Sequence, residues 1–299
     1  FAYYSLMCLF CDLKARGEAT ASATVEPVAR PQHVWNARRG FLLAAGAAAA
    51  TPVLAQVDVG QSSALRNLVP AEQLESAANQ QYGQMMAEAK AKGALAPAGD
   101  PQVQRLRNIA RRLIPHAAPW NERARRWQWE VNLIRSNQIN AFCMPGGKIA
   151  FYTGILEKLQ LNDDEAAMIM GHEMAHALRE HARERVAKTN ATGMGLSIAA
   201  QLLGLGQLGD VAANLGTQLL SLKYSRDDET EADLVGLELA ARSAYLPRAS
   251  VTLWQKMAAA GGGAGPGFLS THPSGPNRIR ELEANLPKVQ HLYEQARKG

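Results

Sequence analysis

The stretch His172-Glu173-Met174-Ala175-His176 decides most about this chain, because it spells H-E-x-x-H inside a run that is predicted to be helical. The two histidines are four residues apart, so they project about 40° from each other on one helical face and can reach one metal ion. Glu173 points to the side of that pair, where it can hold a water molecule. Zn²⁺ suits imidazole and carboxylate ligands in tetrahedral geometry, and a catalytic site keeps one position open for water.

The residues before this motif predict where its helix begins. Asn162-Asp163-Asp164-Glu165 is a capped, acidic helix start, because Asn followed three residues later by Glu can satisfy free backbone N–H groups. An apolar run follows, with Ala166, Met168, Ile169 and Met170. An amphipathic helix with two surface histidines is the alternative, since five residues can match the motif by chance.

A zinc site needs a third protein ligand, and an acidic stretch further along the chain offers one. Glu229 and Asp233 are four residues apart and therefore share a helical face. One carboxylate can bind the metal, and the other can hydrogen-bond a ligand or a reaction intermediate. Taken alone, the stretch is more typical of a solvated first helical turn, where the helix dipole favours acidic side chains. Following an H-E-x-x-H helix, it indicates a metal site.

Together these motifs resemble the gluzincin peptidases that include the membrane protease HtpX, the CAAX prenyl endopeptidases and the soluble periplasmic proteases BepA and LoiP. The family pattern is a G-H-E-x-x-H helix, followed by S-R-x-x-E-x-x-x-D at the start of another helix. Further matches are Asn140-Ala141-Phe142 with Pro145-Gly146-Gly147 before the first helix, and Thr271-His272-Pro273 with Arg278-Ile279 after the second. The resemblance covers about residues 65 to 285.

The resemblance implies a zinc metalloendopeptidase with one Zn²⁺ per chain. The zinc ligands of the family correspond to His172, His176 and Glu229, and the third ligand is therefore not the neighbouring Glu231. Glu173 corresponds to the general base, which takes a proton from water and passes it to the leaving amine.

Two further residues carry roles that the resemblance leaves open. Asp233 is expected to act as a second acid or to orient a ligand. His272 stands in the Thr-His-Pro motif beside a Gly-rich loop, and three interpretations remain. It is an ordinary loop residue, it stabilises the oxyanion, or it binds zinc as a fourth ligand and holds the enzyme latent.

The predicted fold is α+β and mostly helical, with a zincin-type peptidase domain and a small antiparallel sheet beside the H-E-x-x-H helix. Alternating apolar and polar residues from Trp127 to Leu133 indicate a half-buried strand. Two more strands are predicted at residues 139–144 and 148–152, joined by a turn at Pro145-Gly146-Gly147. Asn140-Ala141-Phe142 is the expected edge, where main-chain hydrogen bonds can hold an extended peptide substrate.

The N-terminal part of the sequence indicates that the protein is exported. Arg38-Arg39 precedes an uncharged apolar run from Phe41 to Ala50, and Val53-Leu54-Ala55 is typical of a cleavage site. A signal peptide is therefore expected at about residues 34–55, of the Sec or the twin-arginine type, within a non-mature segment 1–55. The expected location is the periplasm, with association to the outer membrane as an option.

The rest of the chain is predicted to be one peptidase unit. Residues 56–125 form its N-terminal helical part, residues 126–285 the zinc metallopeptidase core, and residues 286–299 a C-terminal tail. Between the two ligand helices lies an insert, residues 189–222, whose first part to Gly209 has no charged residue. A soluble helical lid over the cleft is expected, and peripheral membrane contact is the alternative.

The net charge argues against one class of partner, and the cysteine content argues against one kind of active site. The formal net charge is +5, and removal of residues 1–55, with five basic and three acidic residues, leaves about +3. This charge is too small to indicate nucleic acid as a partner. Cys143 is the only cysteine after residue 55 and is predicted to be a small buried strand residue rather than a nucleophile.

The predicted function is hydrolysis of peptide bonds in the cell envelope, in quality control of misfolded or outer-membrane proteins. The expected partners are unfolded or misassembled envelope proteins. One alternative is a metal-stabilised periplasmic chaperone or assembly factor with weak or latent protease activity, against which an intact Glu173 argues. Another is a membrane-bound prenyl-protein endopeptidase, against which the signal peptide and the polar residues of the insert argue.

Overall fold

The H-E-x-x-H stretch lies in α4 (Asp163–Leu178), a helix that begins with a capping box. The Asn162 side chain accepts a hydrogen bond from the Glu165 backbone N–H, and the Glu165 carboxylate accepts one from the Asn162 N–H. Every residue from Glu165 to Leu178 is buried, so α4 is a central helix with no solvated face. The alternative of an amphipathic helix with two surface histidines is therefore wrong.

The computed structural model describes residues 57–191, 223–260, 267–272 and 277–298. The predicted signal peptide and all but the first three residues of the insert 189–222 lie outside the described residues. None of the described helices is both long enough and apolar enough to cross a membrane. In chain order the other elements are η1 (Ala64–Leu68), α1 (Ala71–Ala91), α2 (Pro101–Leu113), η2 (Ile114–His116), η3 (Glu122–Arg125), β1 (Glu130–Ile134), β2 (Ala141–Met144), β3 (Lys148–Tyr152), α3 (Thr153–Lys158), α5 (His181–Ala191), α8 (Arg226–Arg242), α9 (Ala249–Ala259), α10 (Phe268–Thr271) and α11 (Arg278–Ala296).

The mostly helical α+β fold with a small sheet is as predicted, but the sheet is mixed rather than antiparallel. Its strand order is β1-β3-β2, in which β2 pairs with β3 antiparallel and β1 pairs with β3 parallel. The sequence prediction missed this because alternation of apolar residues reports which face is buried and not the direction of the strand. The hairpin between β2 and β3 turns at Gly146 and Gly147, which both have positive φ.

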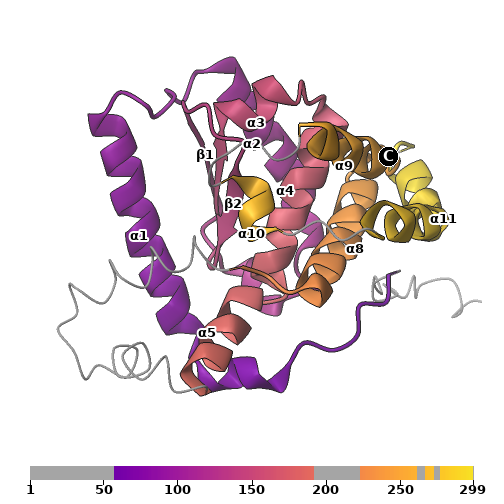
Figure 1. Cartoon of the computed structure of the whole chain (residues 1–299), viewed down its shortest axis with the longest axis horizontal. Coiled ribbons are helices and arrows are strands. Elements are labelled where there is room, and N and C mark those ends of the chain that lie inside the picture. Colours follow the sequence, from indigo (N-terminus) through magenta and orange to yellow (C-terminus); the bar gives the residue numbers. More distant parts are fainter. Residues whose placement is uncertain (1–56, 192–222, 261–266, 273–276, 299) are drawn as a thin grey trace, which may run out of the picture. The chain divides into compact units, whose positions relative to one another are not determined.

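The sheet separates two hydrophobic cores. Figure 1 shows α1 on one side of the strands and α4 on the other. On one face, Ile149 and Phe151 of β3 pack in the core that contains α2 and α4. On the other face, Phe142 and Ala150 pack with α1, whose Tyr82 hydroxyl donates a hydrogen bond of 2.6 Å to the Ile149 carbonyl. β2 lies at an edge of the sheet and packs beside α4, so the predicted edge strand and the H-E-x-x-H helix are neighbours.

Two glycines bring the two ligand-bearing helices together. A Cβ atom at Gly171 of α4 would lie 2.8 Å from the Gly236 carbonyl oxygen of α8. A Cβ atom at Gly236 would lie 2.6 Å from the backbone nitrogen of His172. Only glycine allows this separation of the two backbones, and the close approach lets a carboxylate at the start of α8 reach the histidines of α4.

Candidate metal centre

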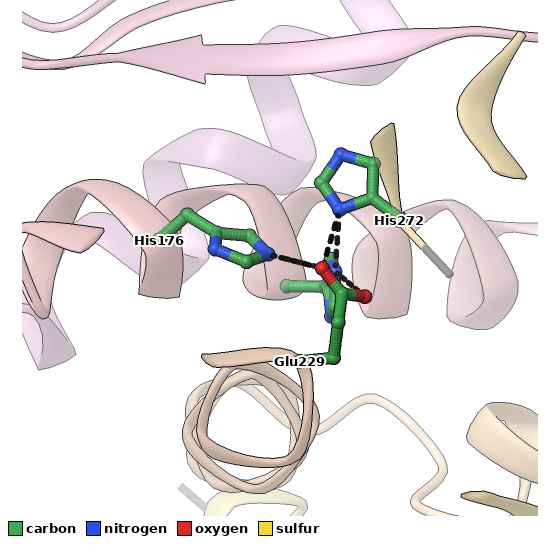
Figure 2. Close-up of side chains that lie close together, drawn as sticks. His176, Glu229 and His272 are labelled. Carbon is green, nitrogen blue, oxygen red and sulfur yellow. Dashed lines mark hydrogen bonds and ion pairs between the residues drawn. The ribbon is translucent and has the colours of Figure 1, made fainter. Parts of the chain in front are cut away.

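Four side chains from three parts of the chain converge at one point. His172 and His176 come from α4, Glu229 from the first turn of α8, and His272 from the residue after α10. One ligand atom from each lies within 4.8 Å of the ligand atoms of the others, and all four residues are buried. Figure 2 shows the rings of His176 and His272 approaching the carboxylate of Glu229 from two sides.

Four of the six separations among the ligand atoms are close to those of a tetrahedral site. Zinc–nitrogen bonds of about 2.0–2.1 Å put the corners of a tetrahedron about 3.3 Å apart. His172 Nε2 lies 3.1 Å from His176 Nε2 and 3.4 Å from His272 Nδ1. The Glu229 Oε1 atom lies 3.4 Å from His176 Nε2 and 3.0 Å from His272 Nδ1. The residues present therefore fit a divalent cation, with His272 at the fourth corner.

The protonation states of two ligands suit a cation. Burial holds the pKa of His176 well below its usual range, so the ring is neutral and has a lone pair to offer. Burial alone would raise the pKa of Glu229, but hydrogen bonds with His176 and His272 outweigh it and bring the pKa below its usual range. Glu229 is therefore a carboxylate.

Glu173 is a buried carboxyl group with an unsatisfied oxygen. Its Oε1 has no hydrogen-bond partner among the described residues, and the Nε2 atom of His272 lies 3.5 Å from it. Burial raises the pKa of Glu173, while the neighbouring His272 and His172 oppose that change. An unpaired buried oxygen is costly unless a further group occupies the site, which agrees with a water or substrate held there.

Asp233 turns towards His172 rather than towards the point where the four ligands meet. Its Oδ1 lies 3.0 Å from His172 Nδ1, and Arg278 donates to both of its oxygens at 2.5 and 2.7 Å. Arg278 also donates to Glu229 Oε2 at 2.8 Å, and its guanidinium lies 3.4 Å from the ring centre of Trp254. Of the two roles expected for Asp233, this geometry fits the one that orients a ligand.

The sequence prediction did not find what Arg278 and Trp254 do. The sequence marks Arg278 only as part of a motif after the second helix. Trp254 lies in α9 and has no motif that marks it. Both reach the site through the fold, since α11 packs against α8 and against α9.

His181 lies beside the metal centre. It is buried, and its Nδ1 is 2.9 Å from His176 Nδ1. Its Nε2 is 3.3 Å from Glu231 Oε2, and Glu231 accepts a hydrogen bond of 2.8 Å from Arg179. Glu231 thus contacts His181 and Arg179 and is not one of the four residues whose ligand atoms converge.

A cleft of about 470 Å³, open to solvent, adjoins Glu173 and His272. The residues Asn140 to Pro145 line it along the edge of the sheet, together with Ala182, Tyr224 and Thr271. Tyr224, which the sequence prediction missed, stacks on the His176 ring with 3.9 Å between the ring centres. Cys143 is a buried strand residue, as predicted, and burial raises the pKa of its thiol well above the usual range.

Comparison with known proteins agrees with this site. The sequence profile of "Peptidase family M48" matches residues 101–286. The mitochondrial metalloendopeptidase OMA1 of Schizosaccharomyces pombe is 42% identical over 166 residues, which are 54% of this chain and 48% of that protein. Human OMA1 is 30% identical over 178 residues, which are 56% of this chain and 34% of that protein.

A bacterial relative matches as well. The metalloprotease LoiP of Escherichia coli K12 is 28% identical over 205 residues, which are 67% of this chain and 76% of that protein. LoiP is one of the proteases that the sequence motifs resemble. The similarity to the OMA1 proteins was not predicted from the motifs. The chain spans about half of the yeast relative from S. pombe and about a third of human OMA1.

Proposed function

We propose that this chain, which belongs to peptidase family M48, is a zinc-dependent endopeptidase. The observation that carries the proposal is the group His172, His176 and Glu229 beside the unpaired oxygen of Glu173, at the head of a cleft. Three ligands of this kind and a nearby carboxyl group form the set that zinc hydrolases use.

The metal would be held by the Nε2 atoms of His172 and His176 and by the Glu229 carboxylate. Two nitrogens and one oxygen are a donor set that zinc accepts, and the spacing of 3.1 to 3.6 Å among these atoms suits its tetrahedral preference. When bound, zinc would supply a Lewis acid that polarises a peptide carbonyl and makes a nearby water more acidic.

Glu173 would move the proton. It accepts a proton from the water as that water forms a bond to the peptide carbon, and it returns the proton to the leaving amine as the C–N bond breaks. The raised pKa of the buried carboxyl group supports this role, because a base whose pKa lies nearer to neutrality can also act as an acid.

The edge of β2 would hold the substrate in extended form. The Tyr152 N–H donates to the Asn140 carbonyl, so the alternation of an antiparallel pair turns the backbone groups of Ala141 and Cys143 away from β3. Both residues line the cleft beside Glu173. A substrate strand that pairs there is held by hydrogen bonds to its backbone. This supports cleavage of unfolded segments in general rather than of one particular sequence.

The cell envelope is the proposed place of action, with unfolded or misassembled envelope proteins as substrates. The basic and apolar sequence at about residues 34–55 supports export, and the likeness to LoiP of E. coli supports a bacterial metalloprotease. Fractionation of cells expressing the full chain, with and without detergent, tests this location. Recovery in the cytoplasmic fraction would contradict it.

The activity is tested with unfolded casein. The wild-type protein is expected to cleave casein, to contain one zinc per chain, and to lose activity on chelation and regain it with added zinc. Wild-type protein that binds zinc but leaves casein and unfolded envelope proteins intact, while preventing their aggregation, would favour the chaperone alternative instead.

A further inference from the structure

We propose that His181 is a positioning residue of the metal centre, which fixes the ring of His176 by accepting a hydrogen bond at Nδ1. The proposal rests on the proposed zinc site and deepens it. It assigns a task to a buried histidine that lies outside the H-E-x-x-H motif and outside the four converging ligand atoms.

Proton positions in the two rings follow from the contacts. His176 faces the other ligands with Nε2, so a neutral His176 that binds metal there carries its proton on Nδ1. That proton must go to an acceptor, and His181 Nδ1 lies 2.9 Å away. His181 therefore offers its Nδ1 lone pair and carries its own proton on Nε2, which lies 3.3 Å from Glu231 Oε2.

The contacts that begin at His176 and His181 continue to the ion pair between Glu231 and Arg179. Glu231 accepts from Arg179 Nε at 2.8 Å, and Arg179 Nη2 donates to the Gly60 carbonyl at 3.0 Å. A carboxylate opposite Nε2 selects the tautomer of His181 that keeps Nδ1 free to accept. The orientation of His176 is in this way tied to the end of α4 and to the segment before η1.

A left-handed turn of the backbone brings the ring of His181 to the ring of His176. In a continuous helix His181 would stand five residues beyond His176 and about 140° around the axis, away from the ligand face. Instead α4 ends, and Glu180 adopts a left-handed conformation with φ of 59°. Non-glycine residues rarely hold such a conformation unless surrounding contacts impose it. Here Arg66 and Arg183 bind the Glu180 carboxylate at 3.3 and 3.0 Å.

The two ligand histidines are therefore oriented by different chemistry. His172 gives its Nδ1 contact to the carboxylate of Asp233, which Arg278 neutralises. His176 gives its Nδ1 contact to the imidazole of His181. A further carboxylate at that place would add negative charge to a buried site that already holds Glu173 and Glu229, so an imidazole is the less costly acceptor.

The test compares His181→Leu with His181→Asn. Leucine removes the acceptor, whereas the asparagine Oδ1 stands close to the place of Nδ1 and still accepts. His181→Leu is expected to bind zinc about 10- to 100-fold more weakly in competition with a chelating dye. It should also alter the visible spectrum of the Co²⁺-substituted protein, while His181→Asn stays within a few-fold of wild type in zinc affinity. His116→Leu, a half-buried histidine of η2, serves as the control and should change neither quantity.

Two outcomes would overturn the inference. One is a zinc affinity and cobalt spectrum of His181→Leu equal to those of wild type. The other is an equal loss in His181→Leu and His181→Asn. If the leucine variant fails to fold, His181→Gln replaces it, because its amide reaches the place of Nε2 and should not rescue binding as asparagine does. Failure of the wild type to bind zinc would count against the proposed function instead.

Discussion

At the scale of single residues, the role of Glu173 gives the sharpest prediction. Glu173→Gln keeps the shape of the side chain and removes the base, so casein cleavage should fall by about a hundredfold or more. Zinc content should stay at one per chain, because Glu173 is not among the converging ligand atoms. Turnover close to that of wild type would show that another group moves the proton.

The choice between two neighbouring glutamates gives a second prediction. Glu229→Ala should empty the metal site, because Glu229 supplies the oxygen that faces His176 and His272. Glu231→Ala should keep zinc, though more weakly bound, because Glu231 contacts His181 and Arg179 rather than the converging ligand atoms. Metal analysis of the two purified variants decides between them, and the reverse result would refute the assignment of Glu229.

His272 leads to a third prediction at this scale. Its Nδ1 occupies the corner of the tetrahedron that substrate or water would need, which fits the latent alternative. His272→Ala should therefore retain zinc and raise the basal rate of casein cleavage. A rate that falls by about a hundredfold would favour oxyanion stabilisation instead. Unchanged kinetics and zinc affinity would make it an ordinary loop residue.

Residue spacing predicted the centre of the site but not its surroundings. Four-residue spacing on a helix is sufficient to bring His172 to His176, because helix geometry fixes their directions. The position of His181 could not be predicted in the same way. The left-handed turn at Glu180 ends the helix, and a glutamate carries no sequence signal for such a turn.

At the scale of secondary structure elements, the closeness of α4 and α8 can be tested. Gly236→Ala should lower the free energy of unfolding by about 1–3 kcal/mol, because its Cβ would lie 2.6 Å from the backbone nitrogen of His172. It should also weaken zinc binding, because the shift moves Glu229 away from the histidines. Both quantities are measured by urea denaturation and by chelator competition.

A matched glycine in open space serves as the control. Gly83 lies inside α1, where an added Cβ would meet nothing within 4 Å. Gly83→Ala should raise the free energy of unfolding by about 0.5–1 kcal/mol, because alanine is the better helix former. Equal effects of the two substitutions would show that close backbone approach is not what requires Gly236.

Element prediction succeeded where local pattern carries the information. The third strand was predicted at 148–152 and is β3, since the Gly-Gly turn and the apolar residues mark both of its boundaries. The first strand begins only at Glu130, because Trp127 and Trp129 pack against each other outside the sheet. Its parallel pairing with β3 depends on how the chain crosses the sheet, which no local pattern records.

At the scale of the whole molecule, the site joins parts of the chain that are far apart. Arg278 follows His172 by 106 residues, yet it lies within the same buried network through α11. The motifs showed that these residues belong together, but the sequence could not show that Arg278 neutralises Asp233 and contacts Glu229. Such contacts arise only when α8 and α11 pack, and this packing is a property of the folded chain.

Because the metal would link α4 and α8, its removal should lower the stability of the whole fold. Without a cation, the carboxylates of Glu229 and Asp233 remain buried, and the guanidinium of Arg278 is the positive charge that contacts both. A ligand at a hundred times its dissociation constant stabilises a folded protein by about 2.7 kcal/mol. For a chain of this size, chelation should then lower the melting temperature by about 5 to 10 °C.

The variants separate this effect from general damage by the chelator. Glu173→Gln should show the same shift in melting temperature as the wild type, because it keeps the metal. Glu229→Ala should already melt at the lower temperature and show no further shift on chelation. Added zinc should restore the wild type and Glu173→Gln and leave Glu229→Ala unchanged. A melting temperature of the wild type that is indifferent to chelator and zinc would mean that the four buried ligand residues are held by the fold alone, and that no metal connects the two helices.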